Sequence, residues 1–475
     1  MVSVGNERIL MTVEELTQAT GGSCPGNFAP DSGCSSVVTD SRSVIEGALF
    51  VPLMGENQDG HRFIPEALDS GARVVFVDAA HGEGSANMFS LLAKQHGAAI
   101  IMVENTLTAL QDAAKAYVRK FPGLRRVAIT GSSGKTTTKE LTAAIFSRKY
   151  RVVANAGNLN SETGLPLSVF RIRDEHEVGI FELGMNRRGE MREIAEVLDP
   201  DTALITNIGT AHIGILGSRE AIAEEKKAVF SLFSGESSGF VSETDDFRDF
   251  LVSGVPGSFS FFGPSSTQGI LGTESLGLEG WIIRYETEEI HFPMSGPYNL
   301  ENAFAAISLA RSFSIDPATI REGLESIQTL FGRTEIVRGA VTTIFDYYNA
   351  NPQSMEEAMR FCDELPWQGE KIFILGSMLE LGETTNAAHR AVCEIADRST
   401  AAHILLFGED MIRAGKSMNW NHDSVYFAET MEDLAEKVSS ILQKGAMVFI
   451  KGSRGMALER LRPVLEHFSS GEARS

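Results

Sequence analysis

The sequence contains little cysteine and no long apolar run. The four cysteines, Cys24, Cys34, Cys362 and Cys393, have neither zinc-ligand spacing nor the density of a disulfide scaffold, so they indicate free thiols in a reducing compartment. No apolar run approaches the roughly 20 residues needed to span a bilayer. The N-terminal stretch MVSVGNERIL lacks the basic and apolar regions of a signal peptide. We therefore expect a cytoplasmic protein without membrane insertion.

Positive charge is also scarce. The chain has 63 acidic and 42 basic residues, which gives a formal net charge of −21. Such a field repels nucleic acid and anionic membranes, so we expect neither as a general partner. An anionic nucleotide would need local donors instead, such as backbone N–H groups and a few well-placed lysines or arginines.

The chain is long enough for several hydrophobic cores. At 475 residues and 43% hydrophobic content it predicts a globular α/β protein of two to four domains. We expect a small α/β N-terminal domain at 1–104, whose strands are the apolar runs Ala48–Leu53, Ala72–Asp78 and Ala98–Val103. No internal repeat is evident.

Two larger domains are expected to follow. In residues 105–332, a helical pattern at Leu107–Tyr117 precedes apolar strands at Arg126–Thr130, Val178–Leu183 and Thr202–Asn207, which predicts a central parallel sheet. The runs at 281–285 and 289–294 indicate a hairpin, and 299–313 a helix. In residues 333–475, five strand-like runs alternate with helical stretches, which predicts a Rossmann-like domain with a parallel sheet.

The strongest motif is a glycine-rich turn between a strand and a helix. Its glycines allow backbone N–H groups to face phosphates, and the helix N-terminus adds a positive dipole. Lys135 would reach the β- and γ-phosphates of ATP, and the Thr136 hydroxyl would bind Mg²⁺. The longer phosphate-loop pattern is not met, because Ile129 occupies its first glycine position. The predicted ATP-binding residues of this turn are Gly131, Ser132, Ser133, Gly134, Lys135, Thr136 and Thr137.

Other polar residues follow the predicted strands. Glu182 and His212 lie where ligand-binding loops leave a parallel sheet, so together they favour a metal site beside the phosphate loop. The charged run around Lys226 indicates, by itself, a solvated helix face. The loop Asn158–Pro166 positions a substrate or caps a helix. The Lys451–Gly455 loop is either a carboxylate-binding loop or an exposed basic turn.

Taken in order, these motifs resemble the Mur ligase family of peptidoglycan synthesis. The resemblance runs from about Thr39 to Leu461 and includes the shortened phosphate loop, which explains the missing first glycine. Within the family, Tyr348-Asn-Ala-Asn-Pro-Gln-Ser354, Glu380-Leu-Gly382 and Lys451-Gly-Ser-Arg-Gly-Met456 are similar to motifs of the branch that adds D-alanyl-D-alanine. The substrates implied are UDP-N-acetylmuramoyl-tripeptide, D-alanyl-D-alanine and ATP, joined through an acyl phosphate.

The resemblance also implies a role for each matching residue. Lys135, Glu182, His212 and Lys226 would be catalytic; Thr136, Glu182, His212 and Lys226 would hold two Mg²⁺ ions, with Lys226 carbamylated by CO₂. Asn302 would contact adenine, and Arg333 and Asp346 would close on the nucleotide. The substrate-binding residues implied are Ser41, Arg42, Asn160, Asn349, Asn351, Lys451 and Arg454. Lys227 is the alternative modified lysine, and we expect a monomer.

The chain departs from the family pattern at Tyr298, Phe345, Ser377 and Ala48, where the family usually has His or Asp. Whether the tripeptide ends in meso-diaminopimelate or lysine is not encoded in these motifs. Three other functions remain open at this point: a ligase that adds the third peptide residue, a folylpolyglutamate synthase and a regulatory ATPase.

Overall fold

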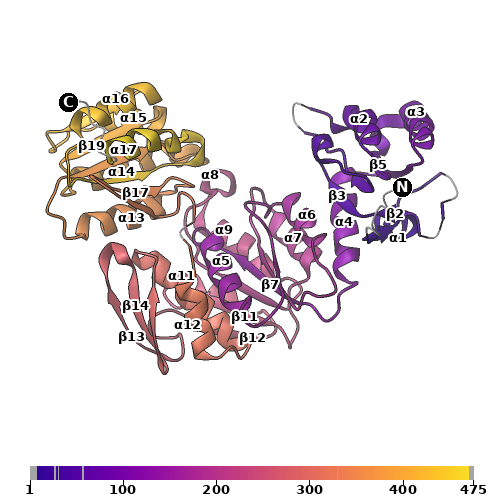
Figure 1. Cartoon of the computed structure of the whole chain (residues 1–475), viewed down its shortest axis with the longest axis horizontal. Coiled ribbons are helices and arrows are strands. Elements are labelled where there is room, and N and C mark those ends of the chain that lie inside the picture. Colours follow the sequence, from indigo (N-terminus) through magenta and orange to yellow (C-terminus); the bar gives the residue numbers. More distant parts are fainter. Residues whose placement is uncertain (1–7, 26–27, 30, 56–57, 329, 470–475) are drawn as a thin grey trace.

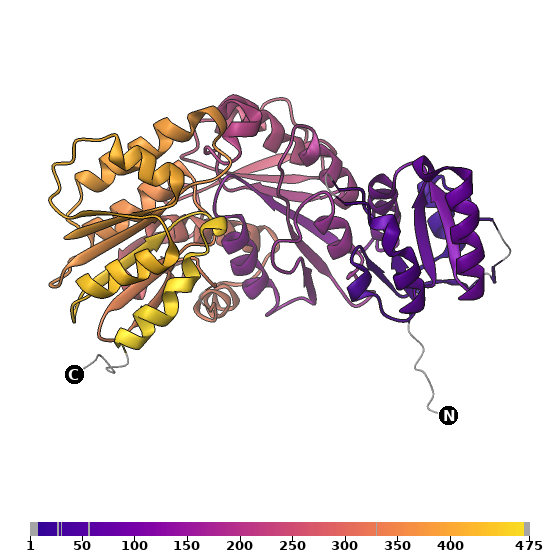
Figure 2. The same ribbon diagram turned by 90° about the horizontal axis from the view of Figure 1, so that it is seen from above.

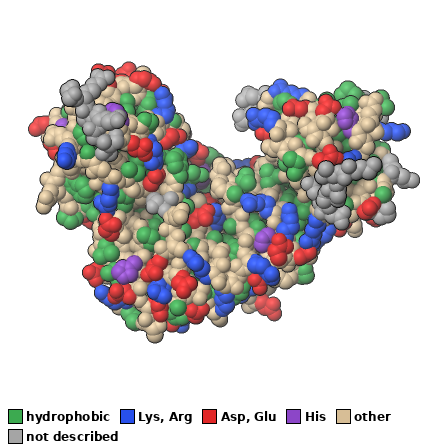
Figure 3. Space-filling view, viewed as in Figure 1, with side chains coloured by type: hydrophobic (Ala, Val, Ile, Leu, Met, Phe, Trp, Pro, Cys, Tyr) green, Lys and Arg blue, Asp and Glu red, His purple; other side chains and the backbone are tan. Residues whose placement is uncertain are grey.

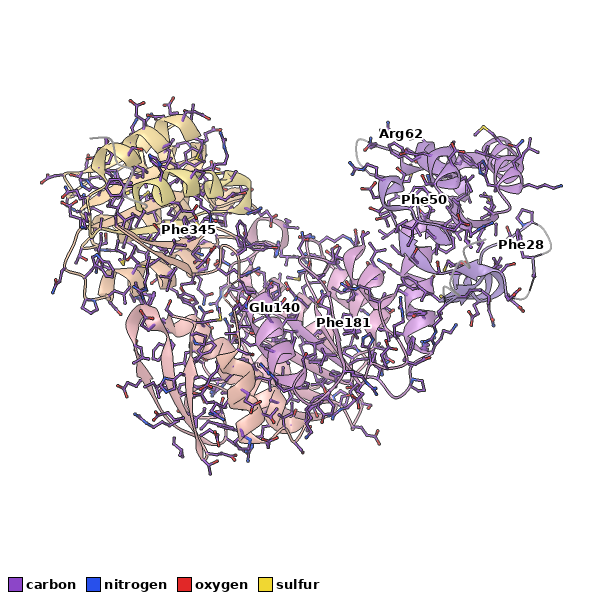
Figure 4. The ribbon with its side chains drawn as sticks, in the orientation of Figure 1. Phe28, Phe50, Arg62, Glu140, Phe181 and Phe345 are labelled. Atoms are coloured by element: carbon purple, nitrogen blue, oxygen red, sulfur yellow. The ribbon has the colours of Figure 1, made fainter. Side chains whose placement is uncertain are left out.

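The computed structural model describes residues 8–25, 28–29, 31–55, 58–328 and 330–469. Most of the N-terminal stretch that was compared with a signal peptide lies outside these residues. The described chain forms three α/β domains in a row, with the N- and C-terminal domains on either side of the central one (Figures 1 and 2). Buried side chains lie inside all three domains, and Figure 4 marks Phe50, Phe181 and Phe345 among them. The predicted three-domain α/β architecture is confirmed.

The N-terminal domain contains a four-stranded parallel sheet. Its strands β3–β6 are neighbours in chain order, and β5 is buried along its whole length. Helix α1 begins with a capping box, in which Thr12 and Glu15 each accept a hydrogen bond from the other's backbone N–H. The elements are β1 (Met11–Thr12), α1 (Val13–Thr20), β2 (Gly33–Cys34), β3 (Ser36–Val38), β4 (Ala48–Phe50), α2 (Ile64–Asp69), β5 (Val74–Asp78), α3 (Gly82–Gln95) and β6 (Ala99–Val103).

Helix α4 (Thr106–Val118) joins this domain to the central one. It packs against α1 on one side and against α6 and α7 of the central domain on the other. Leu16, Leu110 and Leu198 consequently belong to one continuous apolar core. The N-terminal domain is thus attached through a buried helix rather than through an exposed linker alone.

The central domain is built on a six-stranded parallel sheet in the order β12-β11-β10-β7-β9-β8. β7 lies in the middle of this sheet, with β9 on one side and β10 on the other, both parallel to it. The polar groups at the carboxyl ends of these three strands therefore lie close together. The elements are β7 (Arg125–Thr130), α5 (Lys135–Phe146), β8 (Val152–Ala154), α6 (Gly164–Val169), β9 (Val178–Glu182), α7 (Glu190–Leu198), β10 (Thr202–Ile205), α8 (Ile213–Leu216), α9 (Arg219–Lys227), β11 (Ser238–Ser242), α10 (Arg248–Val252) and β12 (Ser258–Phe262).

An antiparallel sheet and two helices complete the central domain. β14 (Trp281–Tyr285) and β15 (Glu288–Phe292) form the predicted hairpin, and β13 (Ile270–Ser275) pairs with β14. Helix α11 (Pro297–Ser312) packs against α5, and α12 (Pro317–Glu325) packs against both α5 and β15. Helix α11 thereby brings its N-terminal residues next to the phosphate loop.

The C-terminal domain has a six-stranded sheet in the order β16-β17-β21-β18-β19-β20. Five strands are parallel as predicted, but β16 runs antiparallel to β17 at the edge, so the sheet is mixed. The elements are β16 (Glu335–Arg338), β17 (Thr342–Asp346), α13 (Pro352–Glu364), β18 (Lys371–Gly376), α14 (Thr385–Asp397), β19 (His403–Phe407), α15 (Glu409–Lys416), β20 (Val425–Ala428), α16 (Met431–Ile441), β21 (Met447–Lys451) and α17 (Arg462–Ser469). In the described part of the chain, no helix is long and apolar enough to cross a membrane.

Candidate active site

The phosphate loop connects β7 to α5 at the centre of the sheet. Gly131 and Gly134 have φ angles of 148° and 79°, values that side chains rarely allow. A Cβ atom at Gly131 would lie 1.8 Å from Thr206 Oγ1, and one at Gly134 would lie 2.3 Å from Asn302 Oδ1. Both conformation and space therefore require glycine at these two positions.

Residues after β10 hold the loop in shape. The N–H groups of Ser132 and Ser133 donate to the carbonyl and side-chain oxygens of Asn207, at 2.9 and 3.1 Å. The Thr206 hydroxyl donates to the Ser133 carbonyl at 2.6 Å. The Lys135 ammonium donates to the Gly131 carbonyl at 3.0 Å, and desolvation lowers its pKa. Sequence reasoning missed Thr206 and Asn207, because they looked like the end of a strand.

The buried Glu182 carboxylate accepts hydrogen bonds from two residues of the predicted site. The Thr136 hydroxyl donates to Oε2 and the Asn160 amide to Oε1, both at 2.7 Å. Arg333, from the start of the C-terminal domain, donates to Thr136 Oγ1 at 3.0 Å. A carboxylate and a hydroxyl are hard oxygen donors, so this group fits Mg²⁺.

The backbone of Glu182 is fixed by a residue that sequence reasoning missed. Asn155, which follows β8, accepts from the Glu182 N–H and donates to the Glu182 carbonyl, both at 2.9 Å. The buried Lys139 ammonium in turn donates to the Asn155 carbonyl at 2.9 Å. These contacts hold the carboxylate beside the phosphate loop.

The adjacent lysines of α9 have different environments. Lys226 is only 1% exposed, and burial, followed by repulsion from Lys135, lowers its pKa well below the usual range. Lys227 instead donates to the carbonyls of Phe250 and Ser253, each at 2.7 Å, on the exposed side. The solvated face suggested by the charge run is therefore wrong for Lys226. A lowered pKa increases the uncharged fraction of the Lys226 amine, and the uncharged amine is the form that reacts with CO₂.

His212 lies between the central and C-terminal domains. It has a left-handed backbone, with φ of 62°, and its Nδ1 lies 2.9 Å from Oε2 of Glu380. Such conformations are uncommon for residues other than glycine and cluster at functional sites.

The C-terminal domain contributes charged groups from the ends of β17 and β21. The Lys451 ammonium contacts Asp346 Oδ2 at 2.6 Å, and both side chains are largely buried. The Arg333 guanidinium lies over the Tyr348 ring, 4.0 Å from its centre. At the departure position Tyr298, the hydroxyl is hydrogen-bonded to Thr334 at 2.9 Å. The tyrosine therefore joins α11 to the start of the C-terminal domain.

Most of these groups surround one cavity of about 470 Å³ between the central and C-terminal domains, although Gly131 and Lys226 do not line it. The predicted residues that line it are Ser132, Ser133, Gly134, Lys135, Thr136, Thr137, Asn160, Glu182, His212, Asn302, Arg333, Asp346, Asn349, Asn351 and Lys451. A second cavity of about 220 Å³ adjoins the first and is lined by Arg454. Three predicted residues line both cavities: His212, Asn349 and Asn351.

Two predicted substrate residues lie elsewhere. Ser41 donates to Glu66 Oε2 at 3.2 Å, and Arg42 pairs with Asp40, all within the N-terminal domain. Neither lines the cavity, and a wide hollow separates this domain from the C-terminal one (Figure 3). The structure therefore does not bring Ser41 and Arg42 together with the phosphate loop.

Comparisons with known proteins agree along the chain. Residues 34–118 match the Mur ligase family catalytic domain, 129–310 the Mur ligase middle domain, and 332–454 the Mur ligase glutamate ligase domain. The UDP-N-acetylmuramoyl-tripeptide–D-alanyl-D-alanine ligase of Treponema pallidum is 44% identical over 461 residues, covering 96% of this chain and 99% of the relative. The enzyme of that name from Bacillus subtilis is 31% identical, covering 95% and 98%.

Solved structures give the same result. A structure of MurF from Acinetobacter baumannii superimposes with a TM-score of 0.84 at 27% identity, covering 95% of this chain and 98% of the other. The MurF ligase of Thermotoga maritima, solved in complex with ADP, has a TM-score of 0.78 at 25% identity, covering 92% and 98%.

Proposed function

Because the chain belongs to the Mur ligase family, we propose that it joins D-alanyl-D-alanine to UDP-N-acetylmuramoyl-tripeptide at the expense of ATP. The observation that carries this proposal is the contact of Thr136 with both Glu182 and Arg333. It brings a phosphate loop, a metal-binding carboxylate and a cation from the next domain to one point. Transfer of a γ-phosphoryl group needs a phosphate-binding loop, a metal site and positive charge in one place.

The first step activates the tripeptide. Its terminal carboxylate attacks the γ-phosphorus, which gives an acyl phosphate and ADP. The loop N–H groups and Lys135 hold the phosphates, and Arg333 adds positive charge where the transferred group develops negative charge. Thr136, Glu182, His212 and Lys226 would hold two Mg²⁺ ions, whose chemistry is to neutralise charge on the phosphoryl oxygens.

The second step forms the amide. The dipeptide amine attacks the acyl carbon through a tetrahedral intermediate, which releases inorganic phosphate. Because an acyl phosphate hydrolyses readily, water must be excluded while the amine arrives. Arg333 and Asp346 line the cavity from the C-terminal domain. Closure of this domain over the nucleotide would therefore exclude water and bring the amine to the acyl phosphate.

Lys226 is the residue we propose to be carbamylated. Carbamylation turns an amine into an anionic oxygen ligand, which suits Mg²⁺ better than a cation does. Its burial, which lowers its pKa, and the proximity of the Glu182 charge support this assignment over Lys227.

The N-terminal domain is proposed to hold the UDP-sugar end, through Ser41 and Arg42. The tripeptide would then cross the hollow toward the phosphate loop, with Asn160 near its reacting end. Asn302, which lies against Gly134, is proposed to contact the adenine, as the resemblance to the family implies. We further propose that the protein is cytoplasmic and monomeric. Light scattering of the purified protein would test whether it is a monomer.

The test is an ADP-release screen with UDP-N-acetylmuramoyl-tripeptides ending in either diamino acid. The amine acceptors are D-alanyl-D-alanine, meso-diaminopimelate, L-lysine and L-glutamate. We expect release only with the dipeptide, and a product whose mass equals the sum of both substrates less water. Release with L-glutamate or a diamino acid would indicate another member of the family. ADP release independent of any amine would contradict the proposal.

A matched pair of variants tests the site itself. Glu182→Gln keeps the side-chain shape but removes the charge, and we expect it to lower kcat at least 100-fold. Glu175→Gln changes an exposed carboxylate before the same strand and should leave kcat unchanged. Equal activity of the two variants would remove Glu182 from the metal site.

A further inference from the structure

Two residues with positive φ flank Arg333, whose guanidinium donates to Thr136 Oγ1 on the phosphate loop at 3.0 Å. Gly332 has a φ of 64° and Thr334 a φ of 51°. Glycine adopts such angles freely. Thr334, however, is the only β-branched residue among the described non-glycine residues with positive φ, and its branched Cβ makes this conformation an outlier. Such a conformation persists only where the surrounding structure holds it in place.

The neighbours of Arg333 are held by two different domains. The Tyr348 N–H, in the C-terminal domain, donates to the Gly332 carbonyl at 3.0 Å. The hydroxyl of Tyr298, on α11 of the central domain, is hydrogen-bonded to the hydroxyl of the buried Thr334 at 2.9 Å. Arg333 lies between these two contacts in the chain. The direction of its side chain therefore depends on both of them.

The Tyr298 side chain crosses the boundary between the two domains. Its ring packs against the apolar core of the C-terminal domain, where it makes an edge contact with the Phe361 ring of α13, 6.5 Å between centroids. Gly296 leaves room for this ring, because a Cβ atom there would lie 2.7 Å from it. Burial raises the pKa of Tyr298 well above its usual range, so the hydroxyl keeps its proton for the hydrogen bond with Thr334. Both the ring and the hydroxyl thus tie α11 to the next domain.

We propose that Tyr298 and Thr334 are a positioning pair for phosphoryl transfer: their hydrogen bond keeps Thr334 at positive φ and thereby directs Arg333 to the phosphate loop. Both residues act through Arg333 rather than on the reacting atoms. This inference rests on the proposed function, in which Arg333 adds positive charge at the transferred phosphoryl group. It gives a task to Tyr298, at which the chain departs from the family pattern.

The first test compares two substitutions of Thr334. Thr334→Val keeps the branched Cβ and loses the hydroxyl, so the strain remains without the hydrogen bond that opposes it. Thr334→Gly also loses the hydroxyl, but glycine adopts a φ of 51° without strain. We expect kcat to fall roughly 3- to 10-fold in Thr334→Val, as loss of one hydrogen bond allows, and to stay within about twofold of wild type in Thr334→Gly. Equal kcat values in the two variants, or a larger loss with glycine, would overturn the proposal.

The second test asks whether glycine rescues the loss of the tyrosine hydroxyl. Tyr298→Phe should lower kcat as much as Thr334→Val does, whereas the double variant Tyr298→Phe, Thr334→Gly should recover to within about twofold of wild type. The matched control is Tyr426→Phe, which removes a hydroxyl bonded to His403 at 3.3 Å and should leave kcat unchanged. If Tyr298 served only for packing, Tyr298→Phe would keep its ring contacts and its activity. That result, or a loss that glycine does not rescue, would contradict the positioning role.

Nucleotide affinity provides a measurement that does not involve the amine. Calorimetric titration with ADP and with a non-hydrolysable ATP analogue compares binding with and without the γ-phosphate. Arg333→Met, Tyr298→Phe and Thr334→Val should each weaken binding of the analogue more than binding of ADP. Adding Tyr298→Phe to Arg333→Met should change this preference no further, because the pair acts through the arginine. A further change would show that Tyr298 acts independently of Arg333, against the proposal. Failure of the proposed function gives a different result: wild-type protein would show no dipeptide-dependent ADP release, while these affinities would keep the expected pattern.

Discussion

Gly134 offers a sharp test of the phosphate-loop geometry. Its φ of 79° costs any other residue about 1–2 kcal/mol. Alanine would also place Cβ 2.3 Å from Asn302 Oδ1, about 1 Å closer than ordinary contact. To relieve this overlap, Asn302 must move and give up its hydrogen bond from Thr138, worth roughly 0.5–1.5 kcal/mol. Gly134→Ala should therefore lower the free energy of unfolding by about 1.5–3.5 kcal/mol in all.

The control is Gly254→Ala. Gly254 has a similar φ of 71°, lies on the exposed surface after α10, and has no atom within 4 Å of a built Cβ. It should lose only the 1–2 kcal/mol of backbone strain. The difference between the two variants thus isolates the contact with Asn302.

Two measurements decide the outcome. Urea unfolding should show the larger loss in Gly134→Ala, and calorimetric titration with ADP should show roughly tenfold weaker binding in that variant alone. The double variant Gly134→Ala, Asn302→Ala should lose less than the sum of the single changes. If Gly134→Ala binds ADP like wild type and is as stable as Gly254→Ala, the reasoning is wrong.

Three further predictions concern buried charges. With ¹³C-labelled bicarbonate, a carbamate carbon signal should appear in wild type and Lys227→Arg but vanish in Lys226→Arg; its loss only in Lys227→Arg would reverse the assignment. Burial raises the pKa of Glu301 from 4.5 to about 7, so the folded state holds a proton that the unfolded state has lost. Stability should therefore fall between about pH 4.5 and 7, by roughly 3 kcal/mol at most, and Glu301→Gln should flatten the urea midpoint between pH 5 and 8. Lys451→Met leaves Asp346 unpaired and should cost about 3 kcal/mol on urea unfolding, most of it recovered by adding Asp346→Asn; a double variant as unstable as the single one would contradict this.

Much of the fold could be predicted because buried parallel strands are continuous apolar runs. β5, β9 and β21 are buried at every position and were found. β16 was missed because all four residues are at least partly exposed, as expected for an edge strand. β11 contains serine and glycine and β12 contains serine, and these residues weaken the apolar signal on which strand prediction depends.

The site was predictable where chemistry dictates the residue type. Lys135, Thr136 and Glu182 follow from what phosphate and Mg²⁺ require. Asn155 and Asn207 were not found, since a single amide carries no local signal and its partner is distant in sequence. The burial of Lys226 also escaped prediction, because three charged neighbours in the same helix suggested solvent. A run of charged residues therefore indicates an exposed helix face only where no other part of the protein packs against that face.

The Asn155 side chain adds one more pair of hydrogen bonds to the sheet beyond the end of β8. The main-chain ladder between β8 and β9 stops at Ala154 and Ile180. The Asn155 side chain then pairs with both backbone groups of Glu182, as a further strand residue would have done. Since the side chain completes the ladder, the main chain is free to turn away and return with Asn160 against the Glu182 carboxylate. One amide thus allows the same segment to end a sheet and begin a catalytic loop.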